Sequence, residues 1–160
     1  MKKITLIIAF ILFCSLSALA QNSTPKAEVF AGYSRVGELK LNGFNTSVTG
    51  NINQYFGVTG EVSGLYTNRF GSLYTFTAGP RLAGHLGNFT LFTHSLFGGA
   101  ASPGGDAAFA AVFGGGVDLK LNDRFSVRAI QVDNLLTRFS GQTQNNRRLT
   151  FGVIFNFGNK

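Results

Sequence analysis

The chain has one cysteine, no tryptophan and three prolines among 160 residues, and charged residues make up only 13% of it. Its cysteine, Cys14, lies in an N-terminal segment that we expect to be removed, so no disulfide is available to stabilise the remainder. With two histidines and no second cysteine, no metal-ligand spacing occurs. No amphipathic helical period follows residue 20, and the 21 glycines weaken helix interiors. The sequence therefore predicts no metal, no cofactor and no helical core.

Residues 1–20 have the pattern of a secretory signal peptide. Two lysines precede an apolar run over residues 4–13, and Ala18-Leu19-Ala20 supplies the small residues of a cleavage site. The apolar run is too short for a membrane-spanning helix of about 20 residues. We expect export, followed by a single domain over residues 21–160. Its basic residues are scattered rather than clustered, which argues against a nucleic-acid partner.

Strict alternation marks the C-terminal segment 147–158. Every second residue is apolar or aromatic, namely Leu149, Phe151, Val153, Phe155 and Phe157. Successive side chains of a strand point to opposite faces, so one face is apolar and the other is mostly small or polar. A soluble protein would bury the apolar face, whereas a membrane barrel turns it toward lipid. Periodicity alone leaves both arrangements open.

Seven further segments upstream also resemble strands. The eight are roughly residues 26–36, 43–53, 56–66, 73–85, 89–99, 108–121, 125–139 and 147–158. Longer connections at 36–42, 67–72, 101–107 and 140–146 alternate with short turns near 53–54, 86–88 and 122–124. An even strand number with alternating connections is typical of outer-membrane barrels. The predicted fold is all-β, an eight-stranded antiparallel up-and-down transmembrane β-barrel.

The polar faces of these segments carry charges of both signs. Those expected to point into the lumen are Glu28, Glu61, Arg81, Asp118, Lys120, Arg128, Asp133 and Arg148. Four acids against four bases predict an interior ion-pair network in a filled lumen, because an unpaired buried charge is costly. Arg128 and Asp133 have opposite parity, so either a β-bulge separates them or Asp133 lies beyond the membrane edge. Pro80 predicts an irregularity in its strand.

Five stretches in order resemble the OmpA/OmpX-type small barrels of bacterial outer membranes. They are AEVFAGY (27–33), GFNTSVTGNINQYFG (43–57), AGPR (78–81), VRAIQVDNLLT (127–137) and LTFGVIFNFG (149–158). The resemblance covers residues 26–158 and implies location in the outer membrane, in contact with its lipid. It also implies assembly by periplasmic chaperones and the barrel-assembly machinery, with Phe155 and Phe157 as the assembly signal.

The favoured function is a non-catalytic one, structural or in surface interaction, with a monomer favoured because a closed barrel has no free edge. Three alternatives remain: a small porin-like channel, a soluble secreted lipocalin-like carrier with its apolar faces inward, and a lipid A-modifying enzyme. The enzyme alternative rests on His94-Ser95. Adjacent strand residues face opposite ways, which favours a lumenal or packed histidine over a catalytic pair.

Overall fold

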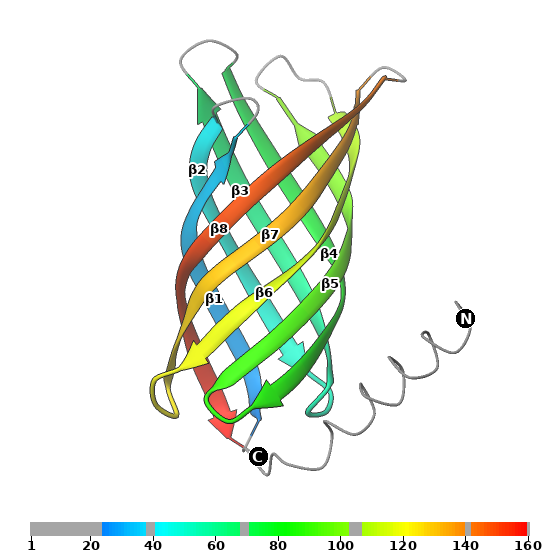
Figure 1. Cartoon of the computed structure of the whole chain (residues 1–160). Coiled ribbons are helices and arrows are strands. Elements are labelled where there is room, and N and C mark those ends of the chain that lie inside the picture. Colours follow the sequence, from blue (N-terminus) through cyan, green and yellow to red (C-terminus); the bar gives the residue numbers. More distant parts are fainter. Residues whose placement is uncertain (1–23, 38–40, 68–70, 103–106, 140–141, 160) are drawn as a thin grey trace, which may run out of the picture.

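The computed structural model describes residues 24–37, 41–67, 71–102, 107–139 and 142–159. Eight strands make up most of these ranges (Figure 1): β1 Pro25–Val36, β2 Leu41–Asn51, β3 Phe56–Thr67, β4 Gly71–Leu86, β5 Phe89–Ala101, β6 Ala107–Lys120, β7 Phe125–Phe139 and β8 Gln142–Asn159. Within the described ranges, no helix is long and apolar enough to cross a bilayer. The expected signal peptide, residues 1–20, lies outside the described residues.

Each strand pairs antiparallel with the next, and β8 returns to pair with β1, so the sheet closes into a barrel. At the closing seam Val29 of β1 lies opposite Phe155 of β8, while on its other side it lies opposite Val48 of β2. Closure gives every strand a hydrogen-bonding neighbour on both sides, which a lipid environment requires. The predicted fold class is confirmed.

The two ends of the barrel differ in which connections they carry. One end, called the turn end, holds the connections at 52–55, 87–88 and 121–124 and both chain ends of the barrel, since Pro25 pairs with Asn159. The opposite end, called the loop end, holds the connections at 37–40, 68–70, 102–106 and 140–141. The termini of the barrel therefore lie together, as Figure 1 shows at the bottom of the view.

Strand lengths depart from the expectation at the loop end. β8 begins at Gln142, where the sequence predicts a loop over 140–146, and its pairing with β7 continues to Phe139 opposite Gln142. No loop-end connection exceeds the five residues 102–106, so the expected contrast between long loops and short turns is absent. A strand end made of polar residues cannot be recognised from the hydrophobic pattern of the sequence. The hydrogen bonds of the ladder join backbone groups, so they form whatever the side chains are.

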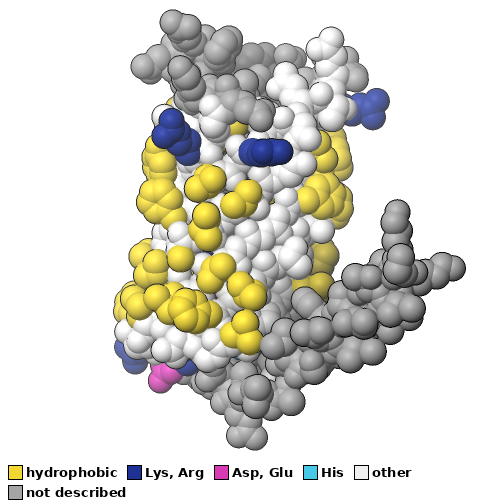
Figure 2. Space-filling model, viewed as in Figure 1, with side chains coloured by type: hydrophobic (Ala, Val, Ile, Leu, Met, Phe, Trp, Pro, Cys, Tyr) yellow, Lys and Arg dark blue, Asp and Glu magenta, His cyan; other side chains and the backbone are white. Residues whose placement is uncertain are grey.

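The burial pattern is inverted relative to a soluble barrel. Val48 and Phe151 are 56% and 51% exposed on the outer wall, whereas Asn45 and Arg148 are 1% and 0% exposed inside. Figure 2 shows yellow apolar side chains in several groups on the visible face of the wall, between blue side chains near its two ends. The apolar faces therefore point outward, and the lipocalin-like arrangement with apolar faces inward is wrong for this chain.

The predicted β-bulge occurs in β7. Arg128 pairs with Gly152 and Gln131 with Thr150, so Ala129 and Ile130 together lie opposite a single residue of β8. Both bulge residues are exposed on the outer wall, which returns the strand to inward parity at Gln131. The bulge therefore places Arg128 and Asp133 both inside, and the alternative of Asp133 beyond the membrane edge does not hold.

The predicted irregularity at Pro80 is also present. The β4–β5 pairing runs to Ala78 opposite Phe97 and resumes at Arg81 opposite His94, leaving a gap at residues 79–80. Because proline has no amide hydrogen, it cannot donate to this ladder. The register is the same on both sides of the gap, so Arg81 keeps its inward direction.

Candidate functional site in the barrel interior

The lumen near the loop end is filled by apolar side chains. This apolar cluster consists of Val36, Leu41, Leu65, Leu96, Val112 and Leu135, with Leu73 packed against it. Each of six strands contributes one buried member, which points inward near the loop end of its strand. A seventh strand, β4, contributes Leu73. The sequence pattern predicts a polar lumen and does not single out these residues. Leu65 does share the strand parity of Glu61 and Ser63, which is the signal that locates it inside.

Arg148 of β8 is the centre of the polar layer below the apolar cluster. Its Nη2 lies 2.7 Å from Asp133 Oδ2 and 2.5 Å from Glu61 Oε1, and all three side chains are almost fully buried. Asp133 lies opposite Arg148 in the register, while Glu61 reaches it from β3 across the lumen. His94 of β5 completes this group, with Nε2 2.9 Å from Asp133 Oδ1. Four strands are thus joined through one guanidinium and two carboxylates.

A second group lies nearer the turn end and is centred on Asp118 of β6. Arg81 Nη2 donates to Asp118 Oδ2 at 2.8 Å, and Arg128 Nε donates to Asp118 Oδ1 at 2.7 Å. Arg81 also pairs with Glu28 at 2.5 Å. Glu28 in turn accepts a hydrogen bond from the Asn51 amide. This group therefore connects β1, β2, β4, β6 and β7.

Gln131 links the two groups into one network. Its amide nitrogen donates to Asp133 Oδ2, and its amide oxygen accepts from Arg128 Nη1, both at 2.7 Å. Gln131 is not among the residues predicted from the sequence, because that set contains only charged residues, although Gln131 shares the strand parity of Asp133. Its inward position follows once the bulge is placed between Arg128 and Gln131.

Aromatic rings complete the packing around the arginines. The guanidinium of Arg128 lies 4.3 Å from the ring centres of both Phe30 and Phe92, and that of Arg81 lies 4.5 Å from Phe92. A desolvated cation over a ring face gains electrostatic stabilisation of roughly 2 kcal/mol. Phe30 and Phe92 are both buried, so these two rings line the lumen although most phenylalanines face outward.

Lys120 differs from the other residues that were expected in the interior network. Its side chain is 29% exposed at the turn end, and its Nζ lies 3.0 Å from Asp123 of the β6–β7 turn. The alternation of β6 gives the correct side of the strand, but the residue lies too near the end to reach the buried groups. In the interior network, His94 occupies the place of a fourth base that was expected for Lys120. His94 pairs with Asp133, and its imidazole carries a positive charge only when it is protonated.

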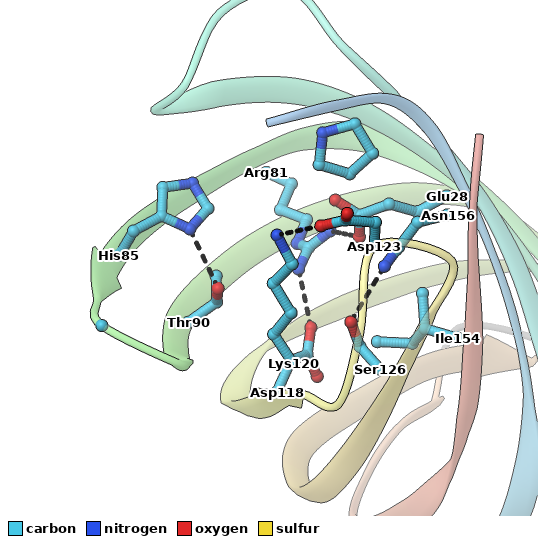
Figure 3. Close-up of a pocket in the computed structure, with 12 residues that line it drawn as sticks. Glu28, Arg81, His85, Thr90, Asp118, Lys120, Asp123, Ser126, Ile154 and Asn156 are labelled. Atoms are coloured by element: carbon cyan, nitrogen blue, oxygen red, sulfur yellow. Dashed lines mark hydrogen bonds and ion pairs between the residues drawn. The ribbon is translucent and has the colours of Figure 1, made fainter. Parts of the chain in front are cut away.

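The turn end of the lumen opens into a small polar pocket of about 40 Å³, drawn in Figure 3. Arg81, Glu28 and Asp118 form its inner wall, and Lys120 lies near its rim. Here His85 Nδ1 lies 2.9 Å from the Thr90 hydroxyl, and the Asn156 amide donates to the Ser126 hydroxyl at 3.0 Å. A pocket of this size holds a few water molecules rather than an organic substrate.

The two residues expected to form the assembly signal lie on the outer wall of β8. The rings of Phe155 and Phe157 are 4.5 Å apart between centroids, and Phe125 of β7 contacts Phe155 edge-on at 5.1 Å. Phe157 is two residues from the end of β8, near the turn end. The structure thus places these rings on an aromatic surface at that end.

The interior offers little for chemistry. His94 points into the lumen, while the neighbouring Ser95 occupies a position of opposite parity on β5. Among the described residues, no group of three or more His, Cys, Asp or Glu side chains is arranged to hold a metal ion. Each of the four interior acids is instead paired with a base. These ion pairs cross-link the strands of the barrel through the lumen.

The closed eight-stranded antiparallel barrel is the fold of the small outer-membrane barrels. Two structures of Ail, the attachment invasion locus protein of Yersinia pestis, show this likeness. One has a TM-score of 0.58 at 17% identity, and the one in complex with the heparin analogue sucrose octasulfate has 0.54 at 18%. Each alignment covers 84% of this chain and 99% of the Ail chain.

Neisserial surface protein A (NspA) has the same fold, with a TM-score of 0.54 at 14% identity over 82% of this chain and 96% of its own. No protein-family model matches the sequence, and no curated protein matches it. At identities this low, the likeness establishes the fold, while function must be argued from the chain's own residues.

Proposed function

We propose that the protein is an integral outer-membrane β-barrel without catalytic activity. The observation that carries this proposal is the inverted burial: Val48, Phe151 and the other large exposed apolar residues encircle the wall, while the ion-paired charges of the network lie inside. In water, so large an apolar surface would be costly, at about 25 cal/mol per Å². A hydrocarbon environment removes that cost, and closure of the sheet meets its hydrogen-bonding requirement.

Export and assembly are part of the same proposal. Residues 1–20 serve as a cleaved signal peptide, and residues 21–160 form the single mature domain. Phe155 and Phe157 serve as the signal by which periplasmic chaperones and the barrel-assembly machinery take up the chain. Their rings contact each other edge-on near the end of β8, with Phe157 exposed and Phe155 half-buried. This placement on the outer wall supports the role, because a partner can reach the rings before the barrel is embedded.

The interior network gives the barrel a structural role as a rigid scaffold. Its four loop-end connections face away from the chain ends of the barrel, and therefore toward the exterior if the termini face the periplasm. We assign surface interaction to this end, and the name of Ail as an attachment protein supports that assignment. The barrel is a monomer in this proposal, since closure leaves no edge to pair with another chain.

Cell fractionation tests the proposal directly. The full-length protein is expected in the detergent-extracted outer-membrane fraction, with the N-terminus of the mature chain at Gln21. The same sample should migrate faster on gels before heating than after it, as a compact barrel that resists detergent. Recovery from the soluble periplasm, without a heat-dependent change in mobility, would overturn the proposal.

The porin-like alternative predicts ion conductance across planar bilayers. The apolar cluster opposes it, because six buried aliphatic side chains occupy the lumen at the loop end. The ion-paired layer below occupies the middle of the lumen as well. We therefore expect the purified barrel to insert without stepwise increases in current, and regular open-channel steps would favour the alternative.

A further inference from the structure

The apolar outer wall is interrupted near the loop end of β6, β7 and β8. One row of directly paired residues crosses these strands as Phe113, Asn134 and Arg147. The next outward residue of β8 toward the loop end is Asn145, which is exposed like Arg147. Figure 2 shows blue and white side chains toward the loop end of the wall, next to the yellow groups. Polar groups therefore enter the apolar wall near its loop end.

These residues border a hollow in the outer wall of about 420 Å³. Phe113 and Val132 form its apolar side, and Asn134, Asn145 and Arg147 form its polar side. Asp133 also borders the hollow, but its carboxylate is turned into the lumen and bound by Arg148 and His94. It therefore does not neutralise Arg147. A site of this kind suits a molecule with an anionic head and an apolar tail.

Among the described residues, the charged side chains exposed on the outer wall around the hollow are all arginines. Arg147 forms no ion pair within the described part of the chain. Arg35 of β1 pairs in register with Leu149, which places it diagonally beside Arg147 on the outer face. Arg138 lies farther along β7 and is also exposed. Among the described residues, every acid is either buried or at the turn end.

We propose that this hollow binds the phosphate-bearing head group of a membrane lipid. The planar guanidinium of Arg147 matches two phosphate oxygens, the amides of Asn134 and Asn145 donate further hydrogen bonds, and the first acyl carbons pack against Phe113 and Val132. An arginine on a lipid-facing wall is destabilising at the bilayer centre but nearly neutral at the interface, where phosphates lie. The inference rests on the proposed membrane location.

Binding of a defined lipid to the purified, folded barrel tests this site. Native mass spectrometry from detergent micelles measures the apparent affinity for lipid A with its phosphates and for the same lipid dephosphorylated. Arg147→Gln is expected to weaken binding of the phosphorylated lipid about tenfold, through loss of a charge-assisted pair. Asn134→Leu, which keeps the charge and removes an amide donor, is expected to weaken it roughly threefold.

Arg124→Gln is the matched control, because Arg124 is an exposed arginine at the turn end and the substitution removes the same charge. It should change the affinity less than about twofold. Equal losses in the two arginine variants would show only general attraction to a cationic barrel and would overturn the site. The site also fails if the wild-type protein binds both lipid forms alike, or if inorganic phosphate occupies the hollow as tightly as the lipid.

Heat-dependent gel mobility of each variant confirms that the barrel is folded before affinities are compared. The two proposals fail in different ways. A wild-type protein in the soluble periplasm contradicts the membrane location, whereas a membrane-embedded barrel without phosphate preference contradicts the lipid site alone. A second copy of the chain seated on the hollow would appear as a dimer in the same spectra and would also overturn the site.

Discussion

At the residue scale, Arg148 is the cation shared by two buried carboxylates of the interior. It neutralises both Glu61 and Asp133 and has no exposed surface. Arg148→Met retains much of its length but leaves two carboxylates buried without their cation. Removing one partner of a buried ion pair costs about 3–5 kcal/mol, so we expect the free energy of unfolding to fall by that amount. Urea unfolding of the barrel in detergent micelles measures the change.

The control for Arg148→Met neutralises the acids as well. Adding Glu61→Gln and Asp133→Asn to Arg148→Met removes the unpaired charges, so the triple variant should regain more than half of the lost stability. A single variant that loses less than about 1 kcal/mol would show that the lumen is hydrated enough to screen these charges. It would contradict the picture of a tightly packed ionic core.

At the scale of the element, the bulge of β7 decides which side chains enter the lumen. Deleting Ala129 removes the extra residue while Ser126, Arg128 and Gln131 keep their inward parity. Deleting Val127 shortens β7 equally, but turns Arg128 toward lipid and away from Asp118. We expect the first deletion to fold with a small loss of stability, and the second to lose several kcal/mol or fail to fold.

The two deletions are compared by heat-dependent gel mobility and by urea unfolding in micelles. Equal damage from both would show that the extra twist of the bulge matters more than the side to which Arg128 points. Equal tolerance of both would show that the strand can slide until Arg128 returns to the lumen. Either result would contradict the conclusion that the bulge decides which side chains of β7 enter the lumen.

At the scale of the whole molecule, closure between β1 and β8 defines the fold. Ala31 and Val153 lie opposite each other across this seam, on the outer wall. The chain has no cysteine after Cys14, so Ala31→Cys with Val153→Cys introduces a single possible disulfide in the mature domain. Directly opposed strand residues lie about 4.5–5.5 Å apart, within the range that a disulfide spans. We expect efficient cross-linking upon oxidation.

The cross-linked barrel should keep a faster gel mobility after heating than its reduced form, because the disulfide holds the ends of the sheet together. The matched control is Ala31→Cys with Leu149→Cys, since Leu149 lies opposite Arg35, farther along the seam. This pair should remain reduced in the folded barrel. Equal cross-linking of both pairs would contradict the register of the seam.

The sequence by itself determined the eight strands and the two faces of each strand, and it left a bulge in β7 as one of two alternatives. The two faces follow from the two-residue period of a strand, so Arg148 and Glu61 can be placed on the polar face without any tertiary information. Asp133 is placed inside only by the bulge that the structure shows. Of the expected interior charges, seven are buried or nearly so, and Lys120 lies at the rim instead. The two-residue period shows on which face of a strand a side chain lies, but it does not show how far along the barrel axis that side chain lies.

Only the tertiary structure decided which face is inside, which charges are partners and where the apolar cluster closes the lumen. Arg148 bonds Glu61 across the lumen, although the two residues are 87 positions apart in the sequence. Gln131 links the Arg148 group to the Asp118 group, and no spacing in the sequence indicates this link. Such contacts depend on barrel tilt and stagger, which fix the height of each strand relative to the others. Alternation is a local property of the backbone, whereas partnership across the lumen exists only once the sheet has closed.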